Sequence, residues 1–454
     1  MIQKSFLMGF TTGILMLTGL VVQHFLAKYL TIEEYGIYAL MFSWIGLLSV
    51  FSLNSFNTIV TKATAQNYSS FFRTASKFCF LFSLLGSIAL LIIGFFFESE
   101  RVDLFILLAI FFPFYGGINF ADAYFIGSFQ FNKFSAYMIS SRCLIAASQV
   151  FSVCYLQEVF WLLFFTLLVT SLINVILTSL ICKSIENEKD KKKEKELIRY
   201  GIQLAGINLF ISIANRIQYV LLAALAGTAV LSIYAVAQII PDKTKGLIKS
   251  FTNPLSMYLA SQKKEESIYI TSRLILPLIL FGMVICLTIF LLLPYVIHLI
   301  FGQKYYHAVL YSIILLTPII FAPLNAMFGS IIIYHGYKKF YTILTIGSHI
   351  LQIILFVFLI PQFQIWGVVL SVVSVSIIST LFNLIWFYRI PKPRIGNTIL
   401  TMQKDIEIKG FKTIYFNGRL NAENFFKLIV TKSFNNEENY PLWVKITKIC
   451  FFLR

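Results

Sequence analysis

The sequence has few charged residues, and acidic residues are the scarcer kind. Only 13% of its 454 residues are charged, and 20 Asp and Glu stand against 37 Lys and Arg. Hydrophobic residues make up 58% of the chain, and Phe alone contributes 47. A soluble protein of this length does not need so much apolar surface. The composition therefore excludes an ordinary soluble domain and predicts an all-α polytopic membrane protein.

Several chemical signatures are also missing. There is no Gly-x-x-x-x-Gly-Lys-Ser/Thr run, so nothing indicates ATP hydrolysis, and transport would draw on an ion gradient, the membrane potential or a downhill substrate. No selectivity-filter run marks a channel. The cysteines lack metal-like spacing and the five histidines are scattered, so we expect no cofactor and no metal site. The six cysteines are Cys79, Cys143, Cys154, Cys182, Cys286 and Cys450.

Apolar runs dominate the first 388 residues. A membrane core of about 30 Å requires roughly 20 apolar residues per helix, and twelve such runs fit. The predicted spans are 6–27, 36–60, 78–97, 104–128, 135–156, 159–182, 201–226, 229–257, 274–297, 309–334, 341–360 and 365–388. The first is too long for a removable signal peptide and has no cleavage pattern after it, so we expect it to remain as a helix.

The basic residues fix an orientation for these spans. All but seven of the 37 Lys and Arg lie toward one side of the membrane, almost all of them in loops or termini, and this is the cytoplasmic side by the positive-inside rule. An even number of spans then places both termini in the cytoplasm. Because these residues flank spans or lie in the tail, orientation and anionic lipid headgroups explain them, and we expect membrane lipids rather than nucleic acid as partners.

The spans divide into two halves. We predict a six-helix lobe at 1–182, a basic linker at 183–200, a second lobe at 201–388 and a basic cytoplasmic tail at 389–454. Short matches between the halves recur at offsets of 196 and 206, in order along the chain. Six spans per half make the repeat parallel, so its pseudo-two-fold axis runs along the membrane normal, with a cavity between the lobes. Two interpretations of the tail remain: a passive extension that contains some strand, or a docking site for a partner enzyme.

Polar stripes run along several spans. The seventh carries Asn208, Ser212, Asn215, Arg216 and Tyr219 on one helical face. The offset of 196 places Gln23 of the first span opposite Tyr219, and Asn57 of the second span on Asn253 of the eighth. These stripes either line one cavity or hold helices together, as small and amide residues do in membranes.

Ionisable residues inside spans need a reason, because each costs about 2.5 to 3.5 kcal/mol on insertion scales. Arg142, Arg216, Lys243 and Lys245 are the basic ones. Arg216 is either a ligand contact or part of a buried structural pair. The two lysines either face a cavity or extend to the inner headgroups.

Three further residues are candidates for ion coupling or gating. Asp122 lies at about the depth of Arg142, so the two either form an ion pair or work as a gate. Asp242 precedes Lys243 in the eighth span. His349, well inside the eleventh span, is a candidate proton site.

The sequence resembles a known family at these positions. Leu26 to Leu40, LAKYLTIEEYGIYAL, is similar to the first loop and second helix of bacterial polysaccharide flippases. LAGTAVLSIYAVAQI from Leu225 resembles their seventh-to-eighth connection, and LLPYVIHLIFGQKYYHAVLYSIILL from Leu292 their ninth-to-tenth connection. The resemblance covers about residues 1–390 and extends to the superfamily of multidrug, oligosaccharidyl-lipid and polysaccharide exporters.

The resemblance implies a MATE-like fold and a function in the bacterial cytoplasmic (inner) membrane. Such flippases move undecaprenyl-diphosphate-linked oligosaccharides, as in O-antigen, capsule or exopolysaccharide synthesis, and their anionic substrate implies a cationic cavity. Arg216, Arg142 and Lys243 are then the expected contacts for the diphosphate, with a glycan polymerase or glycosyltransferases as possible pathway partners. The first two spans carry no Arg, unlike those of lipid II flippases.

Two other functions remain open from the sequence. A multidrug or cation exporter of the same fold should prefer an acidic cavity, and Asp122 and Asp242 both have basic residues close by. A membrane-embedded glycan enzyme usually presents a carboxylate or a large external loop, which we do not find. We therefore expect a transporter and no enzyme.

Overall fold

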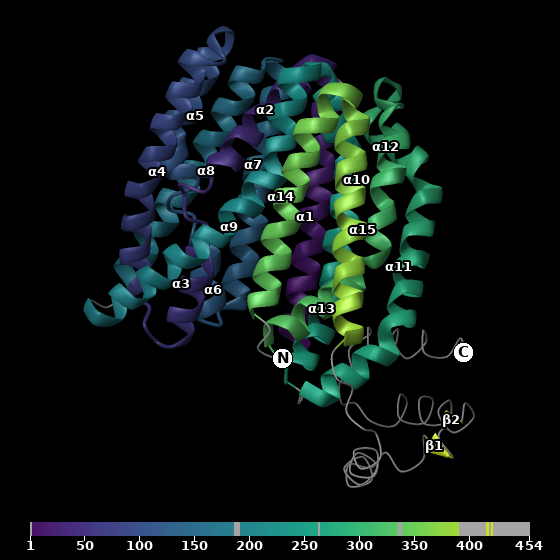
Figure 1. Cartoon of the computed structure of the whole chain (residues 1–454). Coiled ribbons are helices and arrows are strands. Elements are labelled where there is room, and N and C mark those ends of the chain that lie inside the picture. Colours follow the sequence, from purple (N-terminus) through teal and green to yellow (C-terminus); the bar gives the residue numbers. More distant parts are fainter. Residues whose placement is uncertain are drawn as a thin grey trace.

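The protein is a bundle of long helices. The computed structural model describes residues 2–185, 191–261, 264–334 and 338–389, together with two short strands at 415–416 and 419–420. Within these ranges, nine helices are long and apolar enough to cross a membrane. Three more crossings complete the twelve that the sequence predicts (Figure 1). Two of them, at 32–65 and 102–127, are each broken into two helices, and the third is the helix at 228–261.

The first six crossings form the N-terminal lobe. They are α1 (Ile2–Tyr29), α2 with α3 (Ile32–Leu48, Phe56–Ala65), α4 (Phe71–Phe96), α5 with α6 (Val102–Tyr115, Ala121–Gly127), α7 (Phe131–Tyr155) and α8 (Val159–Ser184), with the short η1 (Ser99–Arg101) before α5.

The second six crossings form the C-terminal lobe. They are α9 (Lys191–Ala226), α10 (Thr228–Ser261), α11 (Lys264–Phe301), α12 with η3 and α13 (Ala308–Leu316, Thr317–Phe321, Ala322–Tyr334), α14 (Lys338–Phe363) and α15 (Ile365–Arg389), with η2 (Gln303–Tyr305) before α12.

The start points of the helices repeat between the lobes at the offsets expected from sequence. Ile32 opens α2 and Thr228 opens α10, 196 residues later. Val102 opens α5 and Ala308 opens α12, 206 residues later, and α8 and α15 begin at the same offset. The pseudo-repeat therefore relates whole helices and not only short motifs.

Three crossings are interrupted near their middle. Between α2 and α3 the chain turns through 49–55, where Leu53 has a φ of 49°, a left-handed conformation that is costly for a residue with a branched side chain. Gly116 and Gly117 follow α5, and the tight η3 with Pro318 follows α12. Irregular backbone is tolerated at membrane depth only where protein or a polar cavity satisfies it, so these breaks are expected to face the interior.

The two ends of the bundle carry different parts of the chain. In Figure 1 the lower end carries the N-terminus and the end of α15, while the upper end carries the short connections 30–31, 227 and 302–307. The connection before α2 is fixed by a capping box, in which Thr31 and Glu34 exchange backbone and side-chain hydrogen bonds. This box sets where α2 leaves the upper end.

The upper end holds the two lobes together. Lys304 Nζ donates to the backbone oxygen of Leu30 at 2.7 Å, and His24 Nδ1 lies 2.9 Å from the backbone oxygen of Ile300. The rings of Tyr35 and Tyr305 pack at 5.8 Å.

The helices α2 and α10 approach most closely beside these contacts. A Cβ added to Gly36 would lie 1.9 Å from the backbone oxygen of Thr228, so only glycine allows this approach. The bundle is therefore closed at its upper end.

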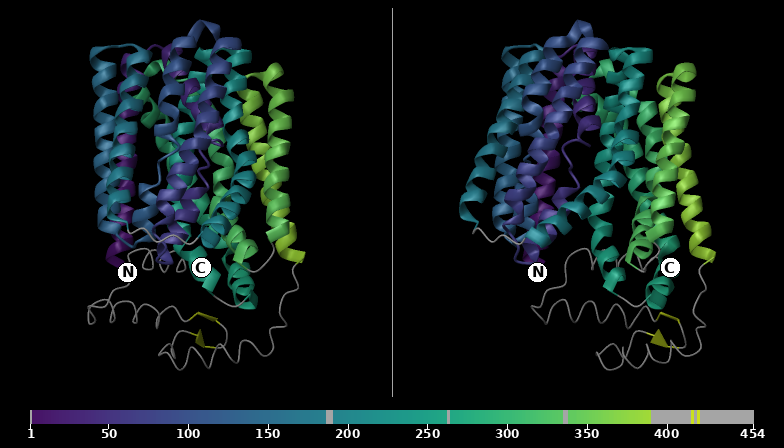
Figure 2. Two further views of the ribbon diagram at one scale, coloured as in Figure 1. Left: turned by 90° about the vertical axis from the view of Figure 1, so that its left-hand side faces the viewer. Right: turned by 60° about the vertical axis from the view of Figure 1, so that its left-hand side comes forward.

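Helix α9 ties the lobes at the lower end. Its first turns come from the predicted basic linker, and Leu197 and Ile198 pack against the core of the N-terminal lobe. Glu194 accepts a hydrogen bond from Thr74 at 2.8 Å, and Lys62 lies 5.4 Å from the ring of Tyr200. The helix then runs without interruption into the C-terminal lobe, as the two views of Figure 2 show.

The tail contributes only two described elements. The strands β1 (Tyr415–Phe416) and β2 (Arg419–Leu420) pair antiparallel. The rest of the predicted tail, beyond Arg389, lies outside the described residues.

Candidate functional site

A large cavity lies between α2 and the helices of the C-terminal lobe. Its volume is about 1280 Å³. From the N-terminal lobe it is lined by Phe42, Ile45, Gly46, Ser49, Asn54 and Tyr115. From the C-terminal lobe it is lined by Ser212, Asn215, Arg216, Gln218, Tyr219, Gln238, Pro241, Asp242, Lys245, Ile248, Lys249, Leu315, Pro318, Ile319, Ala322, Asn325, Ala326, Gly329, Ser348, His349, Gln352, Val372, Val375, Ser376, Ser379 and Asn383.

The cavity begins well below the upper end. Phe42 and Gln238 each lie ten residues into their helix, which is about 15 Å of helix rise. Above them, α2 and α10 pack directly through Gly36 and Thr228. Below them, the lining continues to Lys249 and Asn383, toward the lower end. The cavity is therefore separated from the upper end and extends toward the lower one.

Equivalent faces of α2 and α10 form two of its walls, but their chemistry differs. At the offset of 196, Phe42 corresponds to Gln238 and Gly46 to Asp242, and all four line the cavity. Ser49 corresponds in the same way to Lys245. The repeat therefore presents a small or apolar surface from one lobe and a polar, charged surface from the other.

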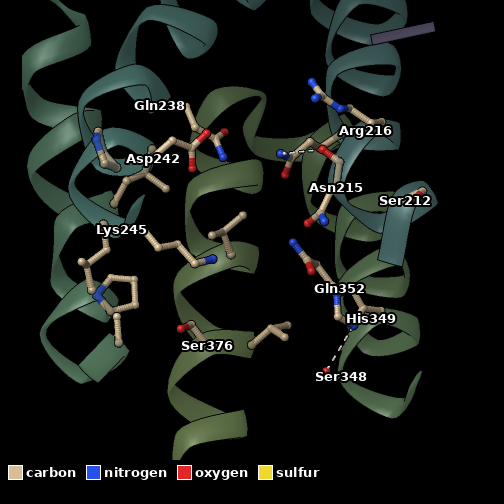
Figure 3. Close-up of a pocket in the computed structure, with 18 of the residues that line it drawn as sticks. Ser212, Asn215, Arg216, Gln238, Asp242, Lys245, Ser348, His349, Gln352 and Ser376 are labelled. Atoms are coloured by element: carbon tan, nitrogen blue, oxygen red, sulfur yellow. Dashed lines mark hydrogen bonds between the residues drawn. The ribbon is translucent and has the colours of Figure 1, made fainter. Parts of the chain in front are cut away.

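Arg216 enters the cavity beside α2. A Cβ added to Gly46 would lie 2.7 Å from Arg216 Nε and 2.9 Å from its Cδ. The absence of a side chain at position 46 thus makes room for the Arg216 side chain across the boundary between the lobes. Figure 3 shows Arg216 with Asn215 and Ser212, all from α9, along one wall.

The charge of the lining is predominantly positive. Arg216, Lys245 and Lys249 line the cavity, and Asp242 is its one carboxylate among the described residues. Arg216 and Lys245 both lie within electrostatic range of Asp242. In Figure 3 the side chains of Gln238, Asp242 and Lys245 from α10 face those of α9 and α14 across the open space. An anionic group entering from the lower end would meet this excess of positive charge.

Polar, uncharged groups surround these charges. Tyr219 donates to Gln238 Oε1 at 3.2 Å. His349 Nδ1 lies 2.6 Å from the backbone oxygen of Thr345, which fixes the Nδ1–H tautomer and leaves Nε2 as the second polar atom of the ring. Gln352 lies one helical turn from His349, on the same wall. Together they offer donors and acceptors suited to hydroxyl groups.

The structure brings together six of the residues predicted from sequence. These are Ser212, Asn215, Arg216, Tyr219, Asp242 and His349, and all of them line the cavity. The side chain of Asn253 lies outside those that the structure describes.

The other six predicted residues do not line this cavity. They are Arg142, Lys243, Asn208, Gln23, Asn57 and Asp122. Gln23 instead accepts a hydrogen bond from Tyr35 near the upper end. The first span therefore does not form a wall opposite the seventh, contrary to the expectation from the repeat.

Lys243 faces away from the cavity. Lys243 lies in a second, mainly apolar pocket of about 190 Å³ with Met16 of α1 and Leu293 of α11. A Cβ added to Gly19 would lie 3.3 Å from Lys243 Nζ. Because successive helical residues are turned by about 100°, Lys243 and Lys245 point in nearly opposite directions, and Lys245 is the one that faces the cavity.

The expected ion pair between Asp122 and Arg142 is not formed. Arg101 with Glu98 at 3.1 Å is the one ion pair in the described part of the chain. Asp122 Oδ1 instead accepts from the backbone N–H of Ala123 at 2.8 Å, in the first turn of α6. The carboxylate stabilises the start of a helix, where the dipole favours negative charge.

Several cavity residues were missed by sequence reasoning. The sequence allowed Lys245 to be either a headgroup contact or a cavity residue. It did not identify Gln218, Gln352, Asn325 or Asn383 as cavity residues. Ser376 and Asn383, seven residues apart on α15, would have given a signal, because they share a helical face. No group of three or more His, Cys, Asp or Glu within the described ranges is placed to hold a metal ion.

The sequence matches one family model. Residues 25–310 match the model described as polysaccharide biosynthesis protein. No curated protein matches the sequence.

Several solved structures share the fold. Lipid II flippase MurJ in an inward closed conformation aligns with a TM-score of 0.65 and 15% identity, over 98% of this chain and 96% of that one. An inward-facing multidrug resistance MATE family transporter of the MOP superfamily aligns with a TM-score of 0.59 and 14% identity, over 82% and 94%. A MOP superfamily transporter from Pyrococcus furiosus aligns with a TM-score of 0.55 and 15% identity, over 85% and 94%. These likenesses confirm the predicted fold of two six-helix lobes.

Proposed function

The chain belongs to the polysaccharide biosynthesis protein family, and from this premise we propose that it is a flippase for an undecaprenyl-diphosphate-linked oligosaccharide. The substrate would be a repeat unit of O-antigen, capsule or exopolysaccharide. The protein moves it from the cytoplasmic to the outer leaflet by alternating access of one cavity.

The observation that carries this proposal is the charge of the cavity. Three basic residues and one carboxylate line a space of about 1280 Å³ in a multi-pass membrane protein. A diphosphate carries negative charge that such a lining attracts, and an Arg binds phosphate oxygens in a bidentate way. Arg216 and Lys245 hold the diphosphate, while Ser, Asn, Gln and Tyr side chains bind sugar hydroxyls.

The same charge argues against the main alternative. A multidrug or cation exporter of the same fold needs carboxylates to bind cationic ligands, and Asp242 has Arg216 and Lys245 within electrostatic range. The solved multidrug transporters support the fold of this chain and nothing about its ligand. We also propose that the chain is a carrier without catalytic activity, and that any glycan polymerase or glycosyltransferase acts beside it.

The orientation follows from the basic residues of the lower end. Lys62, Arg73, Lys133 and Arg389 lie in or near its connections. By the positive-inside rule the lower end, with both termini, faces the cytoplasm of a bacterial cell. The cavity is then directed toward the side on which lipid-linked sugars are assembled.

Replacing Arg216 by Ala tests the assignment. In the host cell the variant should reach the membrane at the normal level and yet reduce surface glycan, because the guanidinium that binds the diphosphate is lost. Normal glycan in the variant would refute the role of Arg216. Purified wild-type protein in proteoliposomes should expose undecaprenyl-diphosphate-linked sugar to an external lectin, and efflux of a cationic dye without such exposure would favour the exporter instead.

A further inference from the structure

The lower part of the cavity contains a chain of side-chain hydrogen bonds with a fixed direction. On α15, Thr380 donates its hydroxyl hydrogen to the backbone oxygen of Ser376 at 2.8 Å. Asn325 Nδ2 of α13 lies 2.8 Å from Thr380 Oγ1. Asn383 Nδ2 lies 3.3 Å from Asn325 Oδ1. We call these residues the Asn383 relay.

The backbone carbonyl at one end sets the orientation of every amide in this relay. A carbonyl can only accept, so the single hydroxyl hydrogen of Thr380 is committed to it. Thr380 Oγ1 can then only accept from Asn325, which must present its NH₂ group. Asn325 in turn presents its oxygen to Asn383, which must donate. The oxygen of Asn383 is left as the free end, so its position does not depend on a choice of amide flip.

That oxygen is buried in the wall of the cavity. Asn383 is 8% exposed and lines the cavity, and its Oδ1 has no hydrogen-bond partner among the described residues. A buried acceptor without a partner is costly, and a small tilt of the Asn383 side chain that turns Oδ1 toward the cavity lets a ligand that brings a donor satisfy it.

A second buried amide of the cavity has the same polarity. Gln218 is 3% exposed, and its Nε2 donates to the backbone oxygen of Asn215 at 3.4 Å. Its Oε1 has no partner within the described part of the chain. Gln218 and Asn383 both line the cavity and both offer an oxygen. The cations of the cavity supply donors for an anion, whereas these two amides supply acceptors.

We propose that the Asn383 relay is a sugar subsite, which binds a hydroxyl group of the glycan through Asn383 Oδ1. This inference rests on the proposed function and adds which part of the substrate binds at this place. Phosphate oxygens cannot donate, so a diphosphate alone cannot satisfy this atom. A sugar hydroxyl can.

The position of the relay agrees with the shape of such a substrate. In Figure 3 Ser376 lies below Arg216 and Lys245, and Asn383 is seven residues further along α15, about 10 Å nearer the lower end. A headgroup whose diphosphate is held by Arg216 and Lys245 therefore extends its sugars toward Asn383. The cations bind the constant part of the substrate and the relay binds the part that differs between glycans.

The test compares two lipids that differ only in their sugar. The full chain in phosphatidylethanolamine nanodiscs is titrated with undecaprenyl diphosphate and with undecaprenyl diphosphate carrying cellobiose. Wild-type protein should bind the cellobiose lipid about tenfold more tightly. Asn383→Ala should abolish this preference and leave the affinity for undecaprenyl diphosphate within about twofold, since the cations are unchanged.

A second variant separates binding from folding. Thr380→Val removes the hydroxyl that fixes Asn325, so Asn383 is free to flip, and the preference for the sugar should fall without a loss of Asn383 itself. Ser374→Ala, on the same helix but exposed and outside the cavity lining, is the matched control and should keep the full preference. A preference that survives in Asn383→Ala overturns the subsite.

The failures of the two proposals are distinct. Equal binding of both lipids by wild-type protein overturns the sugar subsite and leaves the flippase in place. Binding of neither lipid overturns the proposed substrate class, and the subsite with it.

Discussion

Arg216 of α9 occupies the space beside Gly46 of α2 that a side chain at position 46 would fill. A Cβ at position 46 would approach Arg216 Nε to 2.7 Å. The two residues belong to different lobes, so the position of the main cavity cation depends on a helix of the other lobe. This contact gives the first prediction.

Gly46→Ala should displace the Arg216 side chain and weaken binding of undecaprenyl diphosphate about fivefold, on the order of 1 kcal/mol. The same change in an Arg216→Ala background should have no further effect, because the two residues act through one contact. Calorimetric titration of the four proteins completes the cycle. Additive losses would show that Gly46 acts by another route. Gly13→Ala is a suitable control, because a Cβ at that position meets no atom within 4 Å.

Two neighbouring lysines of α10 should differ sharply. Lys245→Ala removes a charge that faces the cavity and should lower the affinity for undecaprenyl diphosphate about tenfold, as expected for a charge-assisted hydrogen bond. Lys243→Ala should leave it within about twofold, because Lys243 lies in the apolar pocket beside α1. Binding measurements on both variants in nanodiscs decide this, and equal losses would contradict the assignment of their directions.

Gly36→Ala should open the upper end. The new Cβ would lie 1.9 Å from a backbone oxygen of α10, which cannot move without shifting the helix, and overpacking of this kind costs about 1 to 3 kcal/mol. The closed state should lose about a factor of ten against the open one. The measurement is labelling of Ser376→Cys, in a background without other cysteines, by an impermeant maleimide added from the upper side. Gly13→Ala should label as slowly as the parent, and slow labelling of Gly36→Ala would count against closure at this contact.

Lys304 should make that closure dependent on pH. Burial lowers the pKa of this lysine from its usual 10.5, and the Glu34 carboxylate opposes the shift in part. The cost of burying the charged amine therefore offsets part of the contact that Lys304 makes with Leu30, and closure gains stability as pH rises through the lowered pKa toward 10.5. Because the group is only partly buried, the gain should stay below about tenfold.

The same labelling assay measures this effect. Upper-side labelling of Ser376→Cys is followed from neutral pH to 10.5 and expressed relative to Lys304→Met, which cancels the pH dependence of the thiol. A constant ratio across this range would show that Lys304 does not control the closed end.

Much of the fold follows from the sequence, and much of the site does not. The apolar runs predict all twelve crossings, and the offsets of 196 and 206 predict where α10 and α12 begin. The break at 49–55 was not predicted, because no proline marks it and its Ser and Asn residues also occur within continuous membrane helices. Hydrophobicity shows that a segment is buried in the membrane, but not whether it is one helix or two.

The direction of a side chain is the harder problem. A span that is apolar on most sides has no strong pattern to fix its rotation about its own axis, so Lys243 and Lys245 could not be told apart. Arg216 was recognised because four other polar residues share its face. Asp122 and Arg142 lie on helices that are in contact and within electrostatic range of each other, but the Asp122 carboxylate is engaged at the start of α6, which the sequence did not show.

The unequal walls of the cavity divide the work between the two repeats. Phe42 and Gly46 on α2 give a surface with little to recognise, whereas their counterparts on α10 and the Asn383 relay carry the chemistry that distinguishes one cargo from another. Apart from Gly46, which acts through Arg216, mutations in the first repeat are therefore expected to change how fast the transporter cycles, and mutations in the second to change what it accepts. Members of this family that serve different glycans should have diverged most in α13 to α15, where a new specificity can evolve without disturbing the moving parts.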